Sequence, residues 1–237
     1  ASEIAKVMEN SYRAVNIAFI DEWTKFAEEI GVDIYEVIEA IRKRPTHSNI
    51  RLPGLGVGGY CLTKDPLFAP TSARKIFNLE GQCFPFSDLA IKVNQRMPLN
   101  VVNRLTEQLE GQVSGKRILL LGISYRSDVG DTRFTPVGLL ARTLVSGGAD
   151  VYAYDPYVTS WPEMTITLLT TLPHPKAFDA IVFAVSHIEF RALDIVEWLG
   201  NCTPAIFDSA NVMSSDQRRL CREMGVKVES IGRGLGL

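Results

Sequence analysis

The sequence predicts an α/β protein in which an all-helical region is followed by a doubly wound parallel sheet. Residues 1–112 contain apolar patterns at helical spacing and no convincing strand, whereas short apolar runs alternate with helical patterns from Lys116 onward. Strands that alternate with helices form parallel sheets that are buried on both faces. The boundary is expected in the segment Gly111-Gln-Val-Ser-Gly115, which gives domains of 1–112 and 113–237.

Composition excludes several broad classes of protein. The chain has 237 residues, of which 46% are hydrophobic and 22% charged, with a formal net charge of −2. This balance provides no basic face for nucleic acid, and no apolar run approaches the roughly 20 residues that span a bilayer. We therefore expect a cytoplasmic protein with no nucleic-acid or membrane partner. The four cysteines show neither Cys-x-x-Cys nor zinc-type spacing, which indicates reduced thiols and no metal site.

The first region reads as a series of helices. Gly31 is a plausible end for a long first helix, and Asp33 is a suitable N-cap for a second helix that Pro45 ends. A later long helix is expected to be interrupted or bent at Pro98. Apart from the helix after Asp33, the expected helices cover 3–30, 65–77 and 86–109.

The second region carries the expected sheet. Its strands are expected at 117–122, 150–154, 180–185, 205–208 and 226–231, with a helix over 136–146. Ligands bind beyond the carboxyl ends of such strands, which places Arg126 and Arg133 where they can meet phosphate or carboxylate groups. Asp128 and Asp131 could equally well pair with these arginines in a self-contained turn. His187, near another strand end, is either a ligand contact or a satisfied structural histidine.

A glycine-rich loop lies between the second and third helices. Gly54-Leu-Gly-Val-Gly-Gly59 formally matches Gly-x-Gly-x-x-Gly, the fingerprint of dinucleotide binding. That fingerprint requires a strand immediately before it, and here the preceding segment is helical and interrupted by proline, so we reject this interpretation. Glycines also let backbone N–H groups approach a ligand, although a plain surface turn is the more common use.

The residue types around this loop are those of nucleophilic catalysis. With a helix beginning near Leu62, Cys61 lies at a helix N-terminus, where free N–H groups favour the nucleophilic thiolate. Asp65, one turn later, can polarise a water molecule. On the first helix, Lys6 and Asn10 share one face, which is either solvated or lines a cleft where they could stabilise an oxyanion and hold a hydroxyl group. The alternative for Cys61, and our expectation for the other cysteines, is a small, buried and inert apolar side chain.

Taken in order, these motifs resemble the UDP-glucose/GDP-mannose dehydrogenase family over nearly the whole chain. The resemblance implies an NAD-dependent enzyme that oxidises C6 of a nucleotide sugar twice and yields the uronic acid. The family's N-terminal NAD domain has no counterpart here, so we expect a fragment that is inactive alone, comprising a central helical dimerisation domain and a UDP-sugar-binding domain. The motifs are Lys6-Val-Met-Glu-Asn10, Gly54-Leu-Gly-Val-Gly-Gly-Tyr-Cys-Leu-Thr-Lys-Asp65, Asn94-Gln-Arg-Met-Pro98, Gly122-Ile-Ser-Tyr-Arg126 and Asp131-Thr-Arg133.

The resemblance also implies roles for single residues. Cys61 would attack the C6 aldehyde to give a thiohemiacetal and then a thioester, with Lys6 stabilising the oxyanion. Asn10 would position substrate or water, and Asp65 would help to activate the water that hydrolyses the thioester. Lys64 and Arg133 would approach NAD. The UDP-sugar would be held by Leu52, Gly54, Gly56, Gly58, Tyr125 and Arg126.

The sequence departs from the family in ways that leave alternatives open. Ala210 stands where the family usually has arginine, and the intersubunit arginine expected before the glycine loop has only His47 and Arg51 as candidates. Val57 favours UDP-N-acetylmannosamine or UDP-N-acetylglucosamine over UDP-glucose. We expect a homodimer formed through the helical domain. The alternatives are a non-catalytic module for UDP-sugar binding or dimerisation, and a hydroxyacid dehydrogenase with a helical dimer domain.

Overall fold

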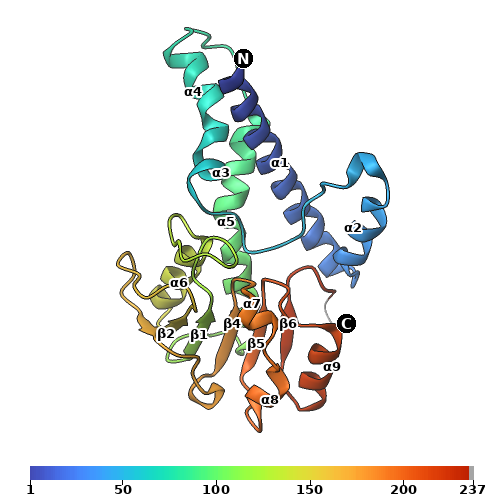
Figure 1. Ribbon diagram of the computed structural model, residues 1–237, viewed down its shortest axis with the longest axis vertical. Coiled ribbons are helices and arrows are strands. Elements are labelled where there is room, and N and C mark those ends of the chain that lie inside the picture. The colour runs from blue at the N-terminus through green and yellow to red at the C-terminus, as the bar shows by residue number, and fades with distance from the viewer. Residues whose placement is uncertain (235–237) are drawn as a thin grey trace. The chain divides into compact units, whose positions relative to one another are not determined.

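The computed structural model describes residues 1–234, and the chain forms two compact units (Figure 1). The helical unit comprises residues 1–97 and the C-terminal segment that starts at Gly232, and the sheet unit comprises residues 98–231. The two units together confirm the predicted fold class. They divide inside α5 (Pro85–Gln108), and the domain boundary expected near residue 112 stays a prediction.

The helical unit follows the expected order of helices with one difference. Asp33 accepts a hydrogen bond from the Tyr35 N–H at 2.9 Å and so caps α2, as predicted. The helix expected over 65–77 is found as α4 over Phe68–Lys75, and the expected first turn is instead a 3₁₀ helix, where the missing N–H of Pro66 is tolerated. The elements are α1 (Ser2–Glu29), α2 (Ile34–Arg42), η1 (Pro45–His47), α3 (Tyr60–Lys64), η2 (Asp65–Leu67), α4 (Phe68–Lys75) and the first half of α5.

The long helix α5 contains Pro98 in its interior and is not interrupted there, contrary to one of our two expectations. The described helices all lack the combination of length and apolar character that is needed to cross a bilayer. One hydrophobic cluster of the helical unit lies where α1 meets α2. Its buried residues are Ile20, Ala27, Ile34, Tyr35 and Ile38, with Ile50 packed against them.

The sheet unit contains a six-stranded sheet in the order β3-β2-β1-β4-β5-β6, and every neighbouring pair is parallel. The order reverses between β1 and β4, which makes that point the switch point of a Rossmann-like sheet. The strands are β1 (Arg117–Leu121), β2 (Asp150–Tyr154), β3 (Thr167–Leu169), β4 (Ala180–Phe183), β5 (Ala205–Asp208) and β6 (Val228–Ser230). Of these, β3 was not predicted, because it has only three residues and none is buried.

Helices cover both faces of the sheet, as a sheet with fully buried central strands requires. On one face, Leu119, Ile181 and Ile206 pack in a buried cluster with residues of α7 (Ile188–Arg191), α8 (Ile195–Leu199) and α9 (Ser215–Glu223). Side chains alternate along a strand, so Phe207 faces the other side, where the Arg104 guanidinium of α5 lies 5.0 Å from its ring centroid. The helix α6 (Pro136–Ser146) packs against β2.

Candidate active site

A buried hydrogen bond joins two segments of the helical unit that lie 55 residues apart in sequence. Asn10 on α1 donates from Nδ2 to Asp65 Oδ2 at 2.8 Å, and the two residues are 0% and 8% exposed. α1 also packs against α3 and η2. The polar face of α1 is therefore brought to the segment that contains Cys61 and Asp65.

One atom of this pair has no partner among the described residues. Asn10 Oδ1 is buried and accepts no hydrogen bond, while Nδ2 of the same amide is committed to Asp65. An unsatisfied buried acceptor costs about 1–3 kcal/mol, a cost that a bound donor such as a water or hydroxyl group would remove. The pair therefore presents two acceptors, Asn10 Oδ1 and the carboxylate of Asp65, to whatever occupies this point.

Cys61 is the second residue of α3 and its side chain is exposed, which excludes the buried alternative. The helix begins at Tyr60, one to two residues earlier than expected, and has only five residues. All four cysteines are free thiols, as predicted. Cys83 is also exposed, so the burial expected for it is wrong. Cys202 is partly buried, and burial raises the pKa of the Cys221 thiol.

The two lysines near this point differ in their partners. Lys64 Nζ lies 3.4 Å from Asp65 Oδ1 and 4.7 Å from the centroid of the Phe68 ring, so its charge is partly engaged. Lys6 lies one helical turn before Asn10 on α1 and is exposed. In the described part of the chain, no carboxylate comes within ion-pair distance of Lys6, which leaves its ammonium group available to a ligand.

The glycine loop is open to solvent at its start and packed at its end. Leu52 is 46% exposed, Gly54 and Gly56 are half-buried, and Gly58 is buried. Gly56 has φ +116°, a value that favours glycine. The loop follows η1 and irregular chain, and within the described helical unit no strand is present to form a dinucleotide fingerprint.

Side chains that sequence reasoning did not select hold this loop in place. Val57 N–H donates to Asn94 Oδ1 at 2.8 Å, and Asn94 Nδ2 donates back to Val57 O at 2.9 Å. Arg51 N–H donates to Asn16 Oδ1 at 3.1 Å. Asn94 belongs to a motif that we noted only for its place on the long helix, and no local pattern shows that its amide reaches the loop.

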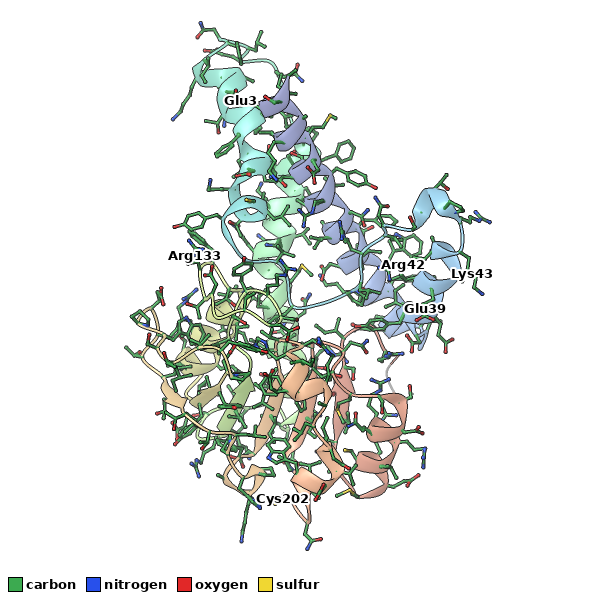
Figure 2. The ribbon with its side chains drawn as sticks, viewed as in Figure 1. Glu3, Glu39, Arg42, Lys43, Arg133 and Cys202 are labelled. Atoms are coloured by element: carbon green, nitrogen blue, oxygen red, sulfur yellow. The ribbon has the colours of Figure 1, made fainter. Side chains whose placement is uncertain are left out.

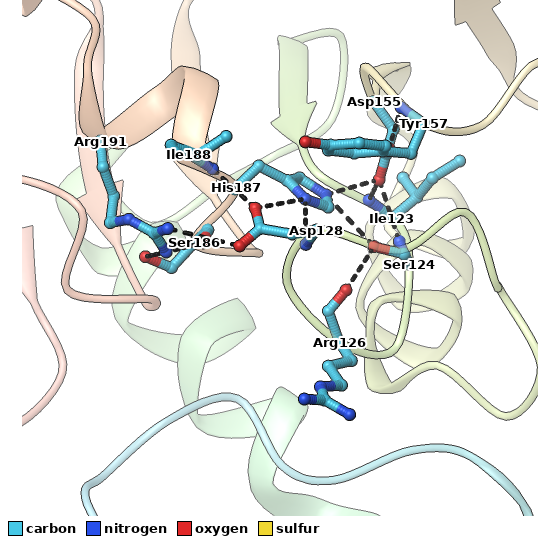
Figure 3. A network of polar contacts seen from close by, with 10 residues as sticks. All are labelled: Ile123, Ser124, Arg126, Asp128, Asp155, Tyr157, Ser186, His187, Ile188 and Arg191. Atoms are coloured by element: carbon cyan, nitrogen blue, oxygen red, sulfur yellow. Dashed lines mark hydrogen bonds and ion pairs between the residues drawn. The ribbon is translucent and has the colours of Figure 1, made fainter.

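In the sheet unit, Tyr125 and Arg126 follow β1 at the switch point between β1 and β4. Ligands of doubly wound sheets bind in the crevice at this position. Arg126 is exposed, its side chain points away from the neighbouring polar network (Figure 3), and no carboxylate of residues 1–234 pairs with it. Its guanidinium is therefore free to bind an anionic group.

The other charged residues of this loop pair within the sheet unit. Arg133 binds Asp131 through Nε at 3.0 Å and Nη2 at 2.6 Å, and the hydrogen bond from Arg133 lowers the pKa of Asp131. Asp128 pairs with Arg191 at 3.3 Å and not with Arg126. The self-contained turn thus forms for Arg133 but not for Arg126. Arg133 lies on the loop before α6, and Cys202, which precedes β5, lies at the opposite end of the strands (Figure 2).

A buried network fixes the loop that carries Arg126 (Figure 3). Asp155 Oδ2 accepts hydrogen bonds from Ile123 N–H at 2.7 Å, Ser124 N–H at 3.1 Å and His187 Nε2 at 3.0 Å. His187 Nδ1 accepts the N–H of Asp128 at 2.9 Å, so the geometry places the imidazole proton on Nε2. With 0% exposure and both nitrogens satisfied, His187 is the structural histidine of our two alternatives.

This network is not a nucleophilic triad, although it contains serine, histidine and aspartate. Ser124 Oγ and Asp155 Oδ2 both face Nε2 of His187, whereas a triad needs them on opposite nitrogens. Ser124 Oγ donates instead to Arg126 O at 3.0 Å. Burial raises the pKa of Asp155, but the hydrogen bonds from His187, Ile123 and Tyr157 outweigh this effect. The pKa of Asp155 is therefore lower than its ordinary value of 3.8. The network therefore fixes the conformation of the loop that carries Arg126.

Neither a metal site nor a complete dinucleotide site is formed by the described residues. No group of three or more His, Cys, Asp and Glu side chains within residues 1–234 could hold a metal ion. The two residues expected to approach NAD, Lys64 and Arg133, lie in different units, and each is engaged by a neighbouring aspartate. Residues 1–234 contain no Gly-x-Gly-x-x-Gly turn directly after a strand.

Comparisons with known proteins agree with this arrangement. Residues 1–96 match the model of the UDP-glucose/GDP-mannose dehydrogenase family, central domain, and residues 119–215 match that of the same family's UDP binding domain. The UDP-N-acetyl-D-mannosamine dehydrogenase of Methanocaldococcus jannaschii is 31% identical over 238 residues, which cover 98% of this chain and 52% of the relative.

Two solved structures are similar over almost all of the chain. The NDP-N-acetyl-D-galactosaminuronic acid dehydrogenase of Methanosarcina mazei superposes with a TM-score of 0.86 at 27% identity, covering 99% of this chain and 51% of that one. The UDP-D-ManNAc dehydrogenase of Pyrococcus horikoshii gives a TM-score of 0.79 at 29% identity, with 97% and 51% covered. The chain thus spans about half the length of these relatives. With both of the family's domains matched in order, the chain belongs to the UDP-glucose/GDP-mannose dehydrogenase family.

Proposed function

We propose that this chain supplies the catalytic and UDP-sugar-binding parts of an NAD-dependent nucleotide-sugar 6-dehydrogenase. The substrate is a UDP-sugar, with UDP-N-acetylmannosamine or UDP-N-acetylglucosamine favoured over UDP-glucose, and the product is the uronic acid. The observation that carries the proposal is the buried hydrogen bond between Asn10 and Asp65, because it joins the polar face of α1 to the segment that contains Cys61. The names of the relatives support the choice of an N-acetylated sugar.

In the proposed reaction, the C6 alcohol first loses its hydroxyl proton and a hydride and becomes the aldehyde. Cys61 Sγ then forms a bond to the aldehyde carbon, and the thiol proton moves to the carbonyl oxygen. The resulting thiohemiacetal loses its hydroxyl proton and a second hydride and becomes a thioester; bound NAD would supply the hydride acceptor in both oxidations. Water then adds to the thioester carbon, the C–S bond breaks, and the acid leaves with the thiolate restored. The exposed position of Cys61 is what this attack requires.

The residues around Cys61 have distinct parts in this scheme. Lys6, whose ammonium has no carboxylate partner within residues 1–234, stabilises the developing oxyanion. Asn10 Oδ1 and Asp65 form the paired acceptors that hold the attacking water, and Asp65 receives its proton. The amide of Asn10 cannot turn away, because its Nδ2 is committed to Asp65.

The nucleotide and the sugar are assigned to two loops. Arg126, exposed and unpaired within the described residues, binds the diphosphate, with Tyr125 beside it. The backbone of Leu52, Gly54, Gly56 and Gly58 holds the sugar. Lys64 and Arg133 are proposed to approach NAD and to attract it by their positive charge. They do not form a complete dinucleotide site, since residues 1–234 form no phosphate-binding glycine turn.

We also propose that two copies of the chain associate through α1. Large apolar side chains follow one face of this helix within an arc of roughly 100° at 100° per residue, opposite the buried face. Phe19, Trp23 and Phe26 form a ladder with ring centroids 6.0 Å apart at each step. A second copy is the partner because a stripe along a whole helix can pack against itself across a twofold axis. The exposed residues are Ile4, Met8, Tyr12, Phe19, Trp23, Phe26 and Ile30.

Thiol labelling tests the proposed function. In a Cys83→Ser background, which removes the other exposed thiol, iodoacetamide is expected to modify Cys61 first, and UDP-N-acetylmannosamine is expected to slow this modification. Calorimetric titration with UDP supplies the second measurement. UDP affinity without protection of Cys61 by any UDP-sugar would favour the non-catalytic module. The absence of both would favour the hydroxyacid dehydrogenase alternative.

A further inference from the structure

We propose that Asn94 is a positioning residue for the sugar, because its amide sets the geometry of the glycine loop. This inference rests on the proposed function, in which that loop holds the sugar of the UDP-sugar. Asn94 lies on α5, more than thirty residues after the loop in sequence, and its contact with Val57 spans 37 positions. Nothing in the proposed chemistry uses Asn94 directly, so it would act only through the loop.

The loop has little internal structure of its own. Among the hydrogen bonds of the described chain, residues 51–58 make none between two backbone groups. Within the described chain, side chains of the flanking helices hold this segment by hydrogen bonds: Asn16 on α1 binds at Arg51, and Asn94 on α5 binds at Val57. A segment without backbone pairing depends on such side chains for a single conformation.

The amide of Asn94 satisfies both backbone groups of Val57 at once. Oδ1 accepts the N–H at 2.8 Å and Nδ2 donates to the carbonyl oxygen at 2.9 Å, as a neighbouring strand would do. Only one orientation of the amide allows both bonds, so the oxygen and nitrogen are assigned without ambiguity. An aspartate at this position could accept from the N–H but could not donate to the carbonyl.

This pairing decides which backbone groups remain for a ligand. The N–H of Val57 is already used and its carbonyl oxygen already accepts one hydrogen bond, so the backbone groups of the neighbouring glycines are the more available ones for a sugar. Gly54 is open, since a Cβ placed there would meet no atom within 4 Å, and Gly56 has the φ of +116° that turns the chain beside Val57. The helix is anchored on either side of Asn94 by buried Ile91 and Met97, so it can serve as a rigid reference for the loop.

The test compares Asn94→Ala and Asn94→Asp with a matched control, Asn103→Asp, at an exposed position on the same helix. Hydrogen exchange of the ligand-free protein is expected to be faster at Val57 in Asn94→Ala and unchanged in the control. In the Cys83→Ser background, the concentration of UDP-N-acetylmannosamine that half-protects Cys61 should rise about tenfold in Asn94→Ala, because two hydrogen bonds are lost. It should rise less in Asn94→Asp, which keeps one of the two bonds.

Affinity for UDP alone separates positioning from general damage. Because the loop is assigned to the sugar, the UDP dissociation constant and the labelling rate without sugar should stay within about twofold in all three variants. The inference would be overturned if the half-protecting concentration of UDP-N-acetylmannosamine were unchanged in Asn94→Ala, or if the affinities for UDP and for the UDP-sugar fell equally. The proposed function would stand in either case. If no UDP-sugar protected Cys61 in the parent protein, the proposed function itself would be contradicted. Faster hydrogen exchange at Val57 in Asn94→Ala would still show that Asn94 holds the loop.

Discussion

Asp65 and Asp155 are two of the buried carboxylates in this chain, and their partners give them different roles. Asp155 accepts hydrogen bonds from His187 and from several backbone N–H groups, so its lone pairs are filled by the protein. Within residues 1–234, the partners of Asp65 are the amide of Asn10 at 2.8 Å and, at a longer distance of 3.4 Å, the ammonium group of Lys64. A carboxylate with free lone pairs beside an unsatisfied acceptor can bind and deprotonate water, whereas a saturated one holds structure.

Replacing Asp155 with asparagine should destabilise the protein in a pH-dependent way. Its pKa is held below 3.8 in the folded state, so its stabilisation is fully present above about pH 4 and is lost as pH falls through the lower folded value. Urea unfolding should show Asp155→Asn about 2 kcal/mol less stable at pH 7, with a difference that shrinks below pH 4. Asp216→Asn, at an exposed site, is the control. A difference that stays constant from pH 7 to pH 3 would contradict the assignment.

Some site residues could be predicted from sequence and others could not. Asn10 and Asp65 were predicted because each belongs to a motif with its own chemistry, and the structure brings these two together. Asn94 and Asp155 bind backbone groups of distant segments. Because nearly all residues have the same backbone groups, the sequence does not indicate which of them a side chain binds. The one usable signal for Asp155 was its place directly after a predicted strand.

At the scale of elements, the turn after β1 is a tightly packed junction of the sheet unit. Gly122 has φ +89°, and a Cβ added there would lie 2.5 Å from Val185 Cβ. The next residues, Ile123 and Ser124, donate their N–H groups to Asp155. The glycine therefore allows the chains that follow β1 and β4 to approach each other, which brings His187 to the loop that carries Arg126.

Substituting this glycine should cost more than the same change elsewhere. Gly122→Ala adds both backbone strain and a clash, and should lower the free energy of unfolding by about 3 kcal/mol or more. Gly225→Ala has a similar φ of +84° with no atom within 4 Å of the added Cβ, and should cost only about 1 kcal/mol. Chemical denaturation of both variants measures the difference, and equal losses would show that packing at Gly122 is not limiting.

The dimer proposed for α1 can be tested with a single charge. Trp23→Glu places a carboxylate in the middle of the apolar stripe, where burying it against a second copy is unfavourable. Sedimentation velocity should show a monomer at a concentration where the parent is a dimer. Val37→Glu makes the same kind of change on α2, where the side chain is 39% exposed, and should leave the dimer intact. A parent that sediments as a monomer, or a Trp23→Glu variant that still dimerises, would refute the proposed interface.

How well each element could be predicted follows from its burial. The helix α6 and the strands β2 and β5 match the predicted residues, because continuous or periodic apolar side chains define them. The helix expected over 65–77 is present as Phe68–Lys75, but its start differs, because the first three of those residues form a 3₁₀ helix. The strand β3 has three residues at the sheet edge and no buried side chain to reveal it.

For the whole molecule, the order of a helical unit and a parallel sheet could be predicted because the apolar period changes along the chain. The division of the chain inside α5 could not be predicted, since a continuous helix gives no local sign that its two halves pack with different units. The proposed chemistry likewise uses both units: Cys61, Lys6, Asn10 and Asp65 in one, and Arg126 in the other. The covalent step at Cys61 is the claim on which the rest of this assignment depends.

That claim is tested most directly by the rate at which the full-length polypeptide carrying this sequence forms uronic acid. With UDP-N-acetylmannosamine and NAD, Cys61→Ser should lower the rate by more than about a thousandfold, because a covalent intermediate can no longer form at sulfur. Cys83→Ser, at the other exposed thiol, should retain the parental rate. Acid formation by Cys61→Ser at the parental rate would contradict the mechanism.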